Sequence, residues 1–358
     1  MNRPTVPLRR LRYLDARDGA PVEAELEVLD EDGGPHPPGL LVHHVRLTGP
    51  GGAFEARWVR AAPGSAAGAR ALDNEILAGL RLRRVAPVVP AGRPFEVARL
   101  VGHDTTGNEP FALVEPYRGR PCGEEAARLL PHDLRRFQTS LVVGVRRMVA
   151  AGIVHRGLGP HTVRWDGDRV QITGFGHAAL VGETRTAVGT PPWSAPEQRP
   201  ERVAGEVTDR DDLWAVGCLV HYVATGTEPE FTEPGSAGPE PGAPLDLPPD
   251  LARLLADLFA APERRPAVAE MLRRVGAPDP VPHAPEPDPE TVRGHREFHT
   301  VRAAKNPAPP PAEAAPEPAA PPVPRWAPPY RLVGVAVAAV TSLLVVLLVV
   351  LLLVGGGR

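Results

Sequence analysis

The sequence contains almost no lysine: of its 40 basic residues only Lys305 is a lysine, and all the others are arginine. Cysteine is scarce too, because Cys122 and Cys218 are the only two and lie far apart. This spacing argues against a disulfide framework or a thiolate metal cluster and favours a reducing compartment. A formal net charge of -3 gives no electrostatic basis for binding nucleic acid, which we therefore do not expect as a partner.

Charge is also missing from one long stretch, residues 332–354, which is 23 residues of apolar and small side chains. As a helix it would extend about 34 Å and could cross a hydrocarbon core of roughly 30 Å. Trp326 and Tyr330 precede it, as in an interfacial aromatic belt. The N-terminus shows no secretory signal. We therefore expect a single-pass, tail-anchored protein in the cytoplasmic membrane, with most of the chain in the cytosol and a short tail, 355–358.

A tract rich in proline, alanine and glutamate covers residues 277–331. Repeated proline removes amide donors and favours extended polyproline geometry, so this tract is expected to be a disordered linker between the globular part and the apolar stretch. A PxxP-type docking site within it is the less favoured alternative.

Hydrophobic patterning divides the remaining chain into a strand-rich half, residues 8–115, and a helical half, residues 116–276. Whether residues 1–27 pack on the first half stays open. The expected elements of the first half are strands over 39–47, 53–61, 95–102 and 110–117 and a helix over 69–84. Those of the second half are helices over 133–152, 211–226, 248–259 and 266–276 and a hairpin formed by 162–165 and 169–173.

Five motifs follow one another in the second half: "IVHRGLGPHTV", "ITGFGHA", "VGTPPWSAPE", "DDLWAVGCLVHYVATGTEP" and "PERRPAVAEML". In this order and spacing, residues 28–276 resemble the eukaryotic-type Ser/Thr protein kinase domain in its bacterial, membrane-anchored form. The resemblance implies an α+β fold with a β-rich N-lobe and a helical C-lobe. It also implies that Glu197 and Arg265 form a buried ion pair and that His155, Arg156 and Asp212 support the C-lobe.

The same resemblance shows where the reacting groups of a kinase are missing. The catalytic-loop aspartate position is Gly157, the metal-binding asparagine position is Thr162, and the D-F-G aspartate position is Gly174. Mg²⁺ requires hard oxygen ligands, and glycine offers none in its side chain. No catalytic residue and no metal site are therefore expected.

The residues that bind the nucleotide in kinases, namely the strand lysine and the glycine-rich loop, are replaced as well. No lysine precedes Lys305, so Arg57 is the candidate replacement for the strand lysine and Glu75 its candidate partner. The segment in place of the glycine-rich phosphate loop carries prolines, among them Pro37 and Pro38, and lacks the GxGxxG pattern. No cofactor is expected, with ATP binding left as an alternative.

Several further residues have two interpretations each. Asp166 and Asp168 are interpreted as turn residues rather than substitute carboxylates. His161 and His177 lack a third ligand for zinc. His43 and His44 are neighbours on a predicted strand and so face opposite sides. Phosphorylation in trans and an ordinary polar loop remain equally open for three threonines near the activation segment: Thr184, Thr186 and Thr190.

The resulting hypothesis is a membrane-anchored, catalytically inactive kinase-like domain that binds, scaffolds or regulates a protein partner. That partner would be an active kinase or a membrane-associated complex. Two alternatives remain: a weak or unconventional ATP-dependent Ser/Thr protein phosphotransferase, and a nucleotide sensor that works without Mg²⁺.

Overall fold

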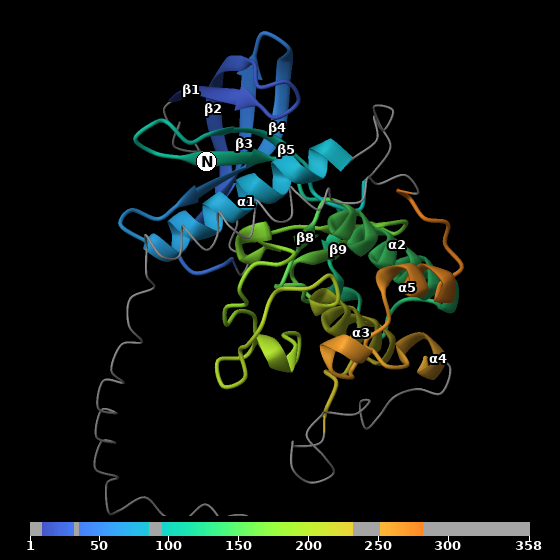
Figure 1. The fold of residues 1–358 in the computed structure, drawn as a ribbon. Helices are drawn as coiled ribbons and strands as arrows, with labels where there is room; N and C mark the ends of the chain where they lie inside the picture. The colour runs from blue at the N-terminus through green and yellow to red at the C-terminus, as the bar shows by residue number, and fades with distance from the viewer. Residues whose placement is uncertain (1–8, 32–35, 86–94, 232–250, 282–358) are drawn as a thin grey trace, which may run out of the picture. The chain divides into compact units, whose positions relative to one another are not determined.

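The computed structural model describes residues 9–31, 36–85, 95–231 and 251–281 (Figure 1). Its strands are β1 (Arg9–Asp15), β2 (Pro21–Glu31), β3 (Leu40–Gly49), β4 (Gly52–Ala61), β5 (Leu100–Asp104), β6 (Phe111–Val114), β7 (Arg120–Pro121), β8 (Ile153–Val154), β9 (Val163–Trp165), β10 (Val170–Ile172) and β11 (Ala179–Leu180). Its α-helices are α1 (Ala66–Val85), α2 (Pro131–Ala150), α3 (Asp211–Thr225), α4 (Ala252–Leu255) and α5 (Val268–Arg274). Short 3₁₀ turns complete the set: η1 (Cys122–Glu125), η2 (Phe175–His177), η3 (Pro196–Gln198) and η4 (Pro262–Arg264).

Six of the strands form a closed antiparallel barrel in the order β1-β2-β3-β4-β6-β5. The longest pairing joins β3 and β4, the two strands predicted around the glycine turn. The barrel closes where β1 pairs with β5, with Leu14 opposite His103 and Asp15 opposite Gly102. Closure removes the free edges that an open sheet would present to other chains.

Strands β1 and β2 answer the question for part of the N-terminal segment, because residues 9–15 and 21–27 belong to the barrel. Residues 1–8 lie outside the described residues. The alternation that encodes the two strands is visible in the sequence. In "EAELEV", Ala24 and Leu26 are buried inside the barrel, whereas Glu23 and Glu25 face outward. This period of two is the signature of a strand with one buried face.

Helix α1 packs its apolar face, which includes Leu72 and Ile76, against Leu40 and Val42 of β3 and Val59 of β4. The helix also contacts the helical half, since Asn74 Nδ2 donates a hydrogen bond to the Gly176 carbonyl at 2.9 Å.

The helical half is built around α2 and α3, which share one apolar core with the hairpin of β9 and β10. Helix α3 is buried nearly all round, from Leu213 to Val223. The predicted pair of Glu197 and Arg265 is confirmed, with Nη1–Oε1 at 2.5 Å and Nη2–Oε2 at 2.9 Å. This pair ties η3 to the turn that precedes α5.

Two predicted elements are wrong in extent. The predicted strand over 95–102 is in fact β5 at 100–104. Residues 96–98 bond to the second half instead, because Ala98 N donates to the Ile172 carbonyl and Ile172 N donates to Glu96. The predicted helix over 248–259 is reduced, among the described residues, to the single turn of α4. It ends after Leu255, because Ala256 has a non-helical ψ of 130°. Asp257 then adopts a left-handed φ of 63°, and Leu258 and Phe259 are buried in the core.

The predicted linker and membrane span lie outside the described residues, apart from 277–281. Among the residues that the structure does describe, no helix is both long enough and apolar enough to cross a membrane. The span over 332–354 stays a prediction.

Candidate functional site

The loop of residues 155–162 is held in place by Asp212 at the start of α3. Asp212 is 2% exposed, and its two carboxylate oxygens accept hydrogen bonds from the backbone N–H groups of His155 (2.7 Å) and Arg156 (2.8 Å). Burial raises the pKa of Asp212 to about 6, and these two hydrogen bonds oppose that rise. Asp212 thus supports the loop through the backbone of His155 and Arg156.

Gly157 leaves an opening in this loop where a kinase would place its catalytic carboxylate. A Cβ built on Gly157 would lie 3.2 Å from Cδ2 of His177, which therefore borders the vacant position. Burial lowers the pKa of His177, and the positive charge of Arg156 lowers it further. Neither the neutral nor the protonated imidazole carries a negative charge, so His177 does not replace the missing aspartate.

Thr162 uses its hydroxyl to hold the loop together. Its Oγ1 accepts a hydrogen bond from the Gly159 N–H at 2.9 Å and donates one to the Gly157 carbonyl at 2.9 Å. Because a hydroxyl has one proton and two lone pairs, these contacts leave it at most one lone pair for a metal.

Gly174 precedes η2 in a left-handed conformation with φ of 76°, and it carries no side chain toward the loop. Gly174 and Thr162 occupy the two positions where a kinase holds Mg²⁺, and Gly157 occupies the position of its catalytic aspartate. The only side-chain oxygen that these positions provide is the Thr162 hydroxyl, which is already hydrogen-bonded within the loop. This set does not fit Mg²⁺, which is bound through carboxylates.

Arg57 on β4 lies beside the segment that joins the two halves of the chain. Its guanidinium carbon stands 5.0 Å from the ring centre of Tyr117, and that of Arg164 stands 5.7 Å from the same ring. Arg164 also donates hydrogen bonds to the carbonyls of Arg118 (3.1 Å) and Gly119 (2.7 Å). Arginine side chains therefore cover the segment between β6 and β7, which joins the two halves.

Glu75 on α1 contacts the helical half, and its role as a partner of Arg57 stays a prediction. Glu75 is 4% exposed, and it accepts a hydrogen bond from the backbone N–H of Phe175. Burial is the larger influence and raises the pKa of Glu75 to about 7.

The segment that replaces the glycine-rich loop also reaches the helical half. Pro37 packs on η2, since a Cβ built on Gly176 would lie 2.8 Å from Pro37 Cγ. Proline has no backbone N–H, so Pro37 and Pro38 provide no donors of the kind that cradle phosphate.

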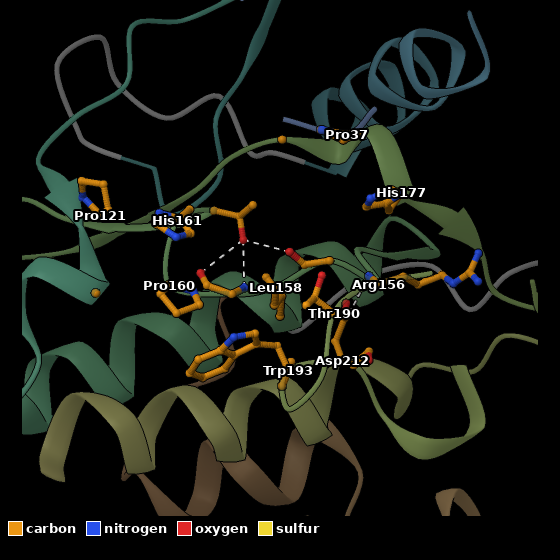
Figure 2. A pocket seen from close by; sticks show the side chains of 18 of the residues that line it. Pro37, Pro121, Arg156, Leu158, Pro160, His161, His177, Thr190, Trp193 and Asp212 are labelled. Atoms are coloured by element: carbon orange, nitrogen blue, oxygen red, sulfur yellow. Dashed lines mark hydrogen bonds between the residues drawn. The ribbon is translucent and has the colours of Figure 1, made fainter. Parts of the chain in front are cut away.

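A cavity of about 580 Å³ opens between this segment and the loop. Its walls come from the proline segment, from η1, from the loop of residues 156–162 and from the segment around Trp193 (Figure 2). Gly157, Thr162 and Gly174, the three positions singled out from the sequence, all line it. The structure thus brings them together as predicted, although Trp193 and Tyr222, which also line the cavity, were not identified from the sequence.

Asp166 and Asp168 have the contacts expected of turn and surface residues. Asp166 Oδ1 accepts the N–H groups of Asp168 and Arg169, as a turn residue does. Asp168 forms a surface ion pair with Arg136. Within the described ranges, no group of three or more His, Cys, Asp or Glu side chains could hold a metal ion.

The three threonines near the activation segment occupy different environments. Thr186 is exposed, and its backbone carbonyl and hydroxyl both accept hydrogen bonds from Arg156 Nη2, the hydroxyl at 3.1 Å. The backbone of Thr184 forms an isolated antiparallel β-bridge with that of Glu206, and Thr190 lines the cavity. Phosphorylation of these threonines stays a prediction.

Comparison with known proteins identifies what this arrangement is similar to. Residues 113–237 match the model of the protein kinase domain. The chain is 26% identical to the probable serine/threonine-protein kinase PkwA of Thermomonospora curvata over 196 residues, which cover 51% of this chain and 26% of that kinase. These similarities support a protein kinase family member.

Two further kinases give the same result. The DNA damage-responsive serine/threonine-protein kinase RqkA of Deinococcus radiodurans is 32% identical over 164 residues, covering 41% of this chain and 24% of RqkA. The serine/threonine-protein kinase AfsK of Streptomyces griseus is 29% identical over 167 residues, covering 44% and 20%. The chain thus spans about a quarter or less of the length of these kinases. The match to the kinase domain begins at Leu113 on β6, so β1 to β5 and α1 lie outside it.

Proposed function

We propose that this protein is a catalytically inactive member of the protein kinase family that works as a binding or scaffolding module. The observation that carries this proposal is that glycine, threonine and glycine occupy positions 157, 162 and 174, where a kinase has acidic and amide side chains. Phosphoryl transfer depends on positioning and on neutralising charge at the phosphates, for which kinases use Mg²⁺ held by acidic and amide side chains. Here the only side-chain oxygen at these positions belongs to Thr162 and already holds the loop.

The contacts of Arg57 and Glu75 support the same proposal. In protein kinases a strand lysine and a helix glutamate form an ion pair that active enzymes require. Here Glu75 is buried on the backbone of η2, and Arg57 stacks on Tyr117. The retained ion pair of Glu197 and Arg265 and the contacts of Asp212 maintain the C-lobe without any of the reacting groups.

Nucleotide binding by the full-length chain in mild detergent tests this proposal. We expect the unfolding temperature to stay unchanged in 5 mM ATP, with and without Mg²⁺. A ligand at 100 times its dissociation constant would instead add about 2.7 kcal/mol of stability. A shift that requires Mg²⁺ would favour the phosphotransferase, and a shift without Mg²⁺ would favour the nucleotide sensor. An active protein kinase in the same buffer serves as the positive control.

We further propose that residues 332–354 anchor the domain to the cytosolic face of the membrane, with residues 277–331 as its tether. The proposal rests on the length of the uncharged run. A chain that ends before residue 332 is expected to move from the membrane fraction to the soluble fraction of cells. If the truncated chain remained in the membrane fraction after a salt wash, the anchor would lie elsewhere.

A further inference from the structure

The segment of residues 181–208, which follows β11, folds back on itself. Val207 N donates a hydrogen bond to the Glu183 carbonyl at 2.8 Å, and Arg185 N donates one to the Gly205 carbonyl at 2.9 Å. The two ends of the segment therefore lie antiparallel and are joined through their backbones. In protein kinases the corresponding segment is ordered by phosphorylation, because the phosphate forms new pairs with arginine side chains.

One buried ion pair fastens this segment to the start of α3. Arg185 donates from Nε to Asp211 Oδ2 at 3.0 Å and from Nη2 to Asp211 Oδ1 at 2.9 Å. The Arg185 side chain is 6% exposed and that of Asp211 is 0% exposed. The remaining nitrogen, Nη1, donates to the Ala204 carbonyl at the other end of the segment. Two parallel charge-assisted hydrogen bonds hold a guanidinium in one orientation, so Arg185 joins both ends of the segment to α3.

The first turn of α3 carries two neighbouring carboxylates with separate roles. Asp211 accepts a further hydrogen bond from Thr208 Oγ1 at 2.6 Å, which closes the end of the segment onto the helix. Asp212 holds the backbone of His155 and Arg156. Negative charge is favourable at the N-terminus of a helix. Asp211 thus holds the segment in the way that Asp212 holds the loop of residues 155–162.

Thr186 lies in this segment beside charges that already compensate one another. It is exposed, and its carbonyl and hydroxyl accept hydrogen bonds from Arg156 Nη2. Arg185 is the second guanidinium near this place. Three carboxylates attract Arg156 electrostatically: Asp211, Asp212 and Glu183. A phosphate on Thr186 would add about two negative charges where carboxylates already outnumber guanidiniums, so it would gain little from ordering the segment.

We propose that the ion pair of Arg185 and Asp211 holds residues 181–208 permanently in one conformation, so that the order of this segment does not depend on phosphorylation of Thr186. The segment then presents the same surface at all times, unlike a kinase segment that is disordered until it is phosphorylated. This inference goes beyond the proposed function and does not rest on it, because an ordered segment is compatible with an active or an inactive site.

Hydrogen–deuterium exchange of the full-length chain in detergent tests the role of the ion pair. Arg185→Gln leaves Asp211 buried without its partner, so the ends of the segment should open more often. We expect the amides of residues 182–185 and 204–207 to exchange roughly tenfold faster, or more. The control Arg202→Gln removes an exposed arginine from the same segment and should change these rates by less than about twofold. Unchanged exchange in Arg185→Gln would overturn the proposal.

Two variants at Thr186 test the independence from phosphorylation. Thr186→Glu supplies a negative charge, and Thr186→Val removes the hydroxyl. We expect both to leave the exchange of the same amides within about twofold of the native rates. Exchange roughly tenfold slower in Thr186→Glu would overturn the proposal, because the order of the segment would then depend on charge at this position. Both variants keep the ion pair, so they remain informative even if Arg185→Gln unfolds.

The exchange result and the nucleotide result are independent. A shift of the unfolding temperature with ATP and Mg²⁺ would overturn the proposed inactivity and leave the role of the ion pair unaffected. Unchanged exchange in Arg185→Gln would overturn only the role of the ion pair.

Discussion

Replacing Arg265 by alanine is expected to lower the free energy of unfolding by about 3–5 kcal/mol, because it leaves a largely buried carboxylate without its partner. The Arg265 side chain is 1% exposed and that of Glu197 is 13% exposed. Arg265 also donates from Nε to the Ala260 carbonyl at 2.9 Å, and its guanidinium lies over the Trp214 ring at 5.5 Å. The substitution therefore removes contacts to three parts of the C-lobe at once. Urea unfolding of the full-length chain in detergent measures the effect.

A matched control is the exposed ion pair between Arg273 and Glu270, whose atoms stand 2.6 Å apart while the Arg273 side chain is 77% exposed. Arg273→Ala is expected to change stability by less than about 1 kcal/mol, because water solvates both partners. Similar losses in the two variants would mean that burial of the Glu197–Arg265 pair does not set its contribution.

Replacing Glu75 by glutamine is expected to stabilise the protein at pH 8 by about 3 kcal/mol. Burial raises the pKa of this carboxyl from 4.5 to about 7, and each pKa unit corresponds to about 1.4 kcal/mol. The folded state therefore binds the Glu75 proton more tightly than the unfolded state does. The resulting stability is fully present below pH 4.5, falls as the pH rises, and is lost once the pH passes about 7.

Glutamine removes this loss, because it is uncharged at every pH and its side-chain oxygen can still accept the Phe175 N–H. At pH 5 the variant should differ from the native chain by less than about 1 kcal/mol. Urea unfolding at pH 5 and pH 8 gives both values, and Asp73→Asn, at an exposed position of α1, controls for a change of charge on the helix. A Glu75→Gln variant less stable than the native chain at pH 8 would indicate an ion pair strong enough to outweigh burial.

Most elements of the fold could be predicted because their patterns are local. The alternation in β3 and β4, the helical spacing of Leu72 and Ile76, and the apolar face of α2 each lie within a short window. The errors arose where a distant segment decides the backbone. Residues 96–98 bond to Ile172 and so leave the predicted strand, and the predicted helix around α4 ends where Leu258 and Phe259 turn into the core.

For the site, the sequence predicted which groups are missing, and the structure decided what the remaining groups do. The identities of Gly157 and Gly174 suffice to rule out a side-chain carboxylate at those positions. That Thr162 bonds its own loop, that Glu75 faces the Phe175 backbone, and that Arg57 shares Tyr117 with Arg164 could not be predicted. Each of these contacts depends on the rotamer of one side chain and on the position of a neighbouring element, which the sequence does not give.

The sequence by itself determined the order of the elements, the missing carboxylates and the absence of lysine before residue 305, since these depend on residue identity and local period alone. Only the tertiary structure decided that β1 closes the barrel against β5 and that Trp193 packs edge to face on Tyr222. The physical reason is the same in both cases. These contacts join residues far apart in the chain, and their free energy arises from surfaces that exist only once the surrounding core has packed.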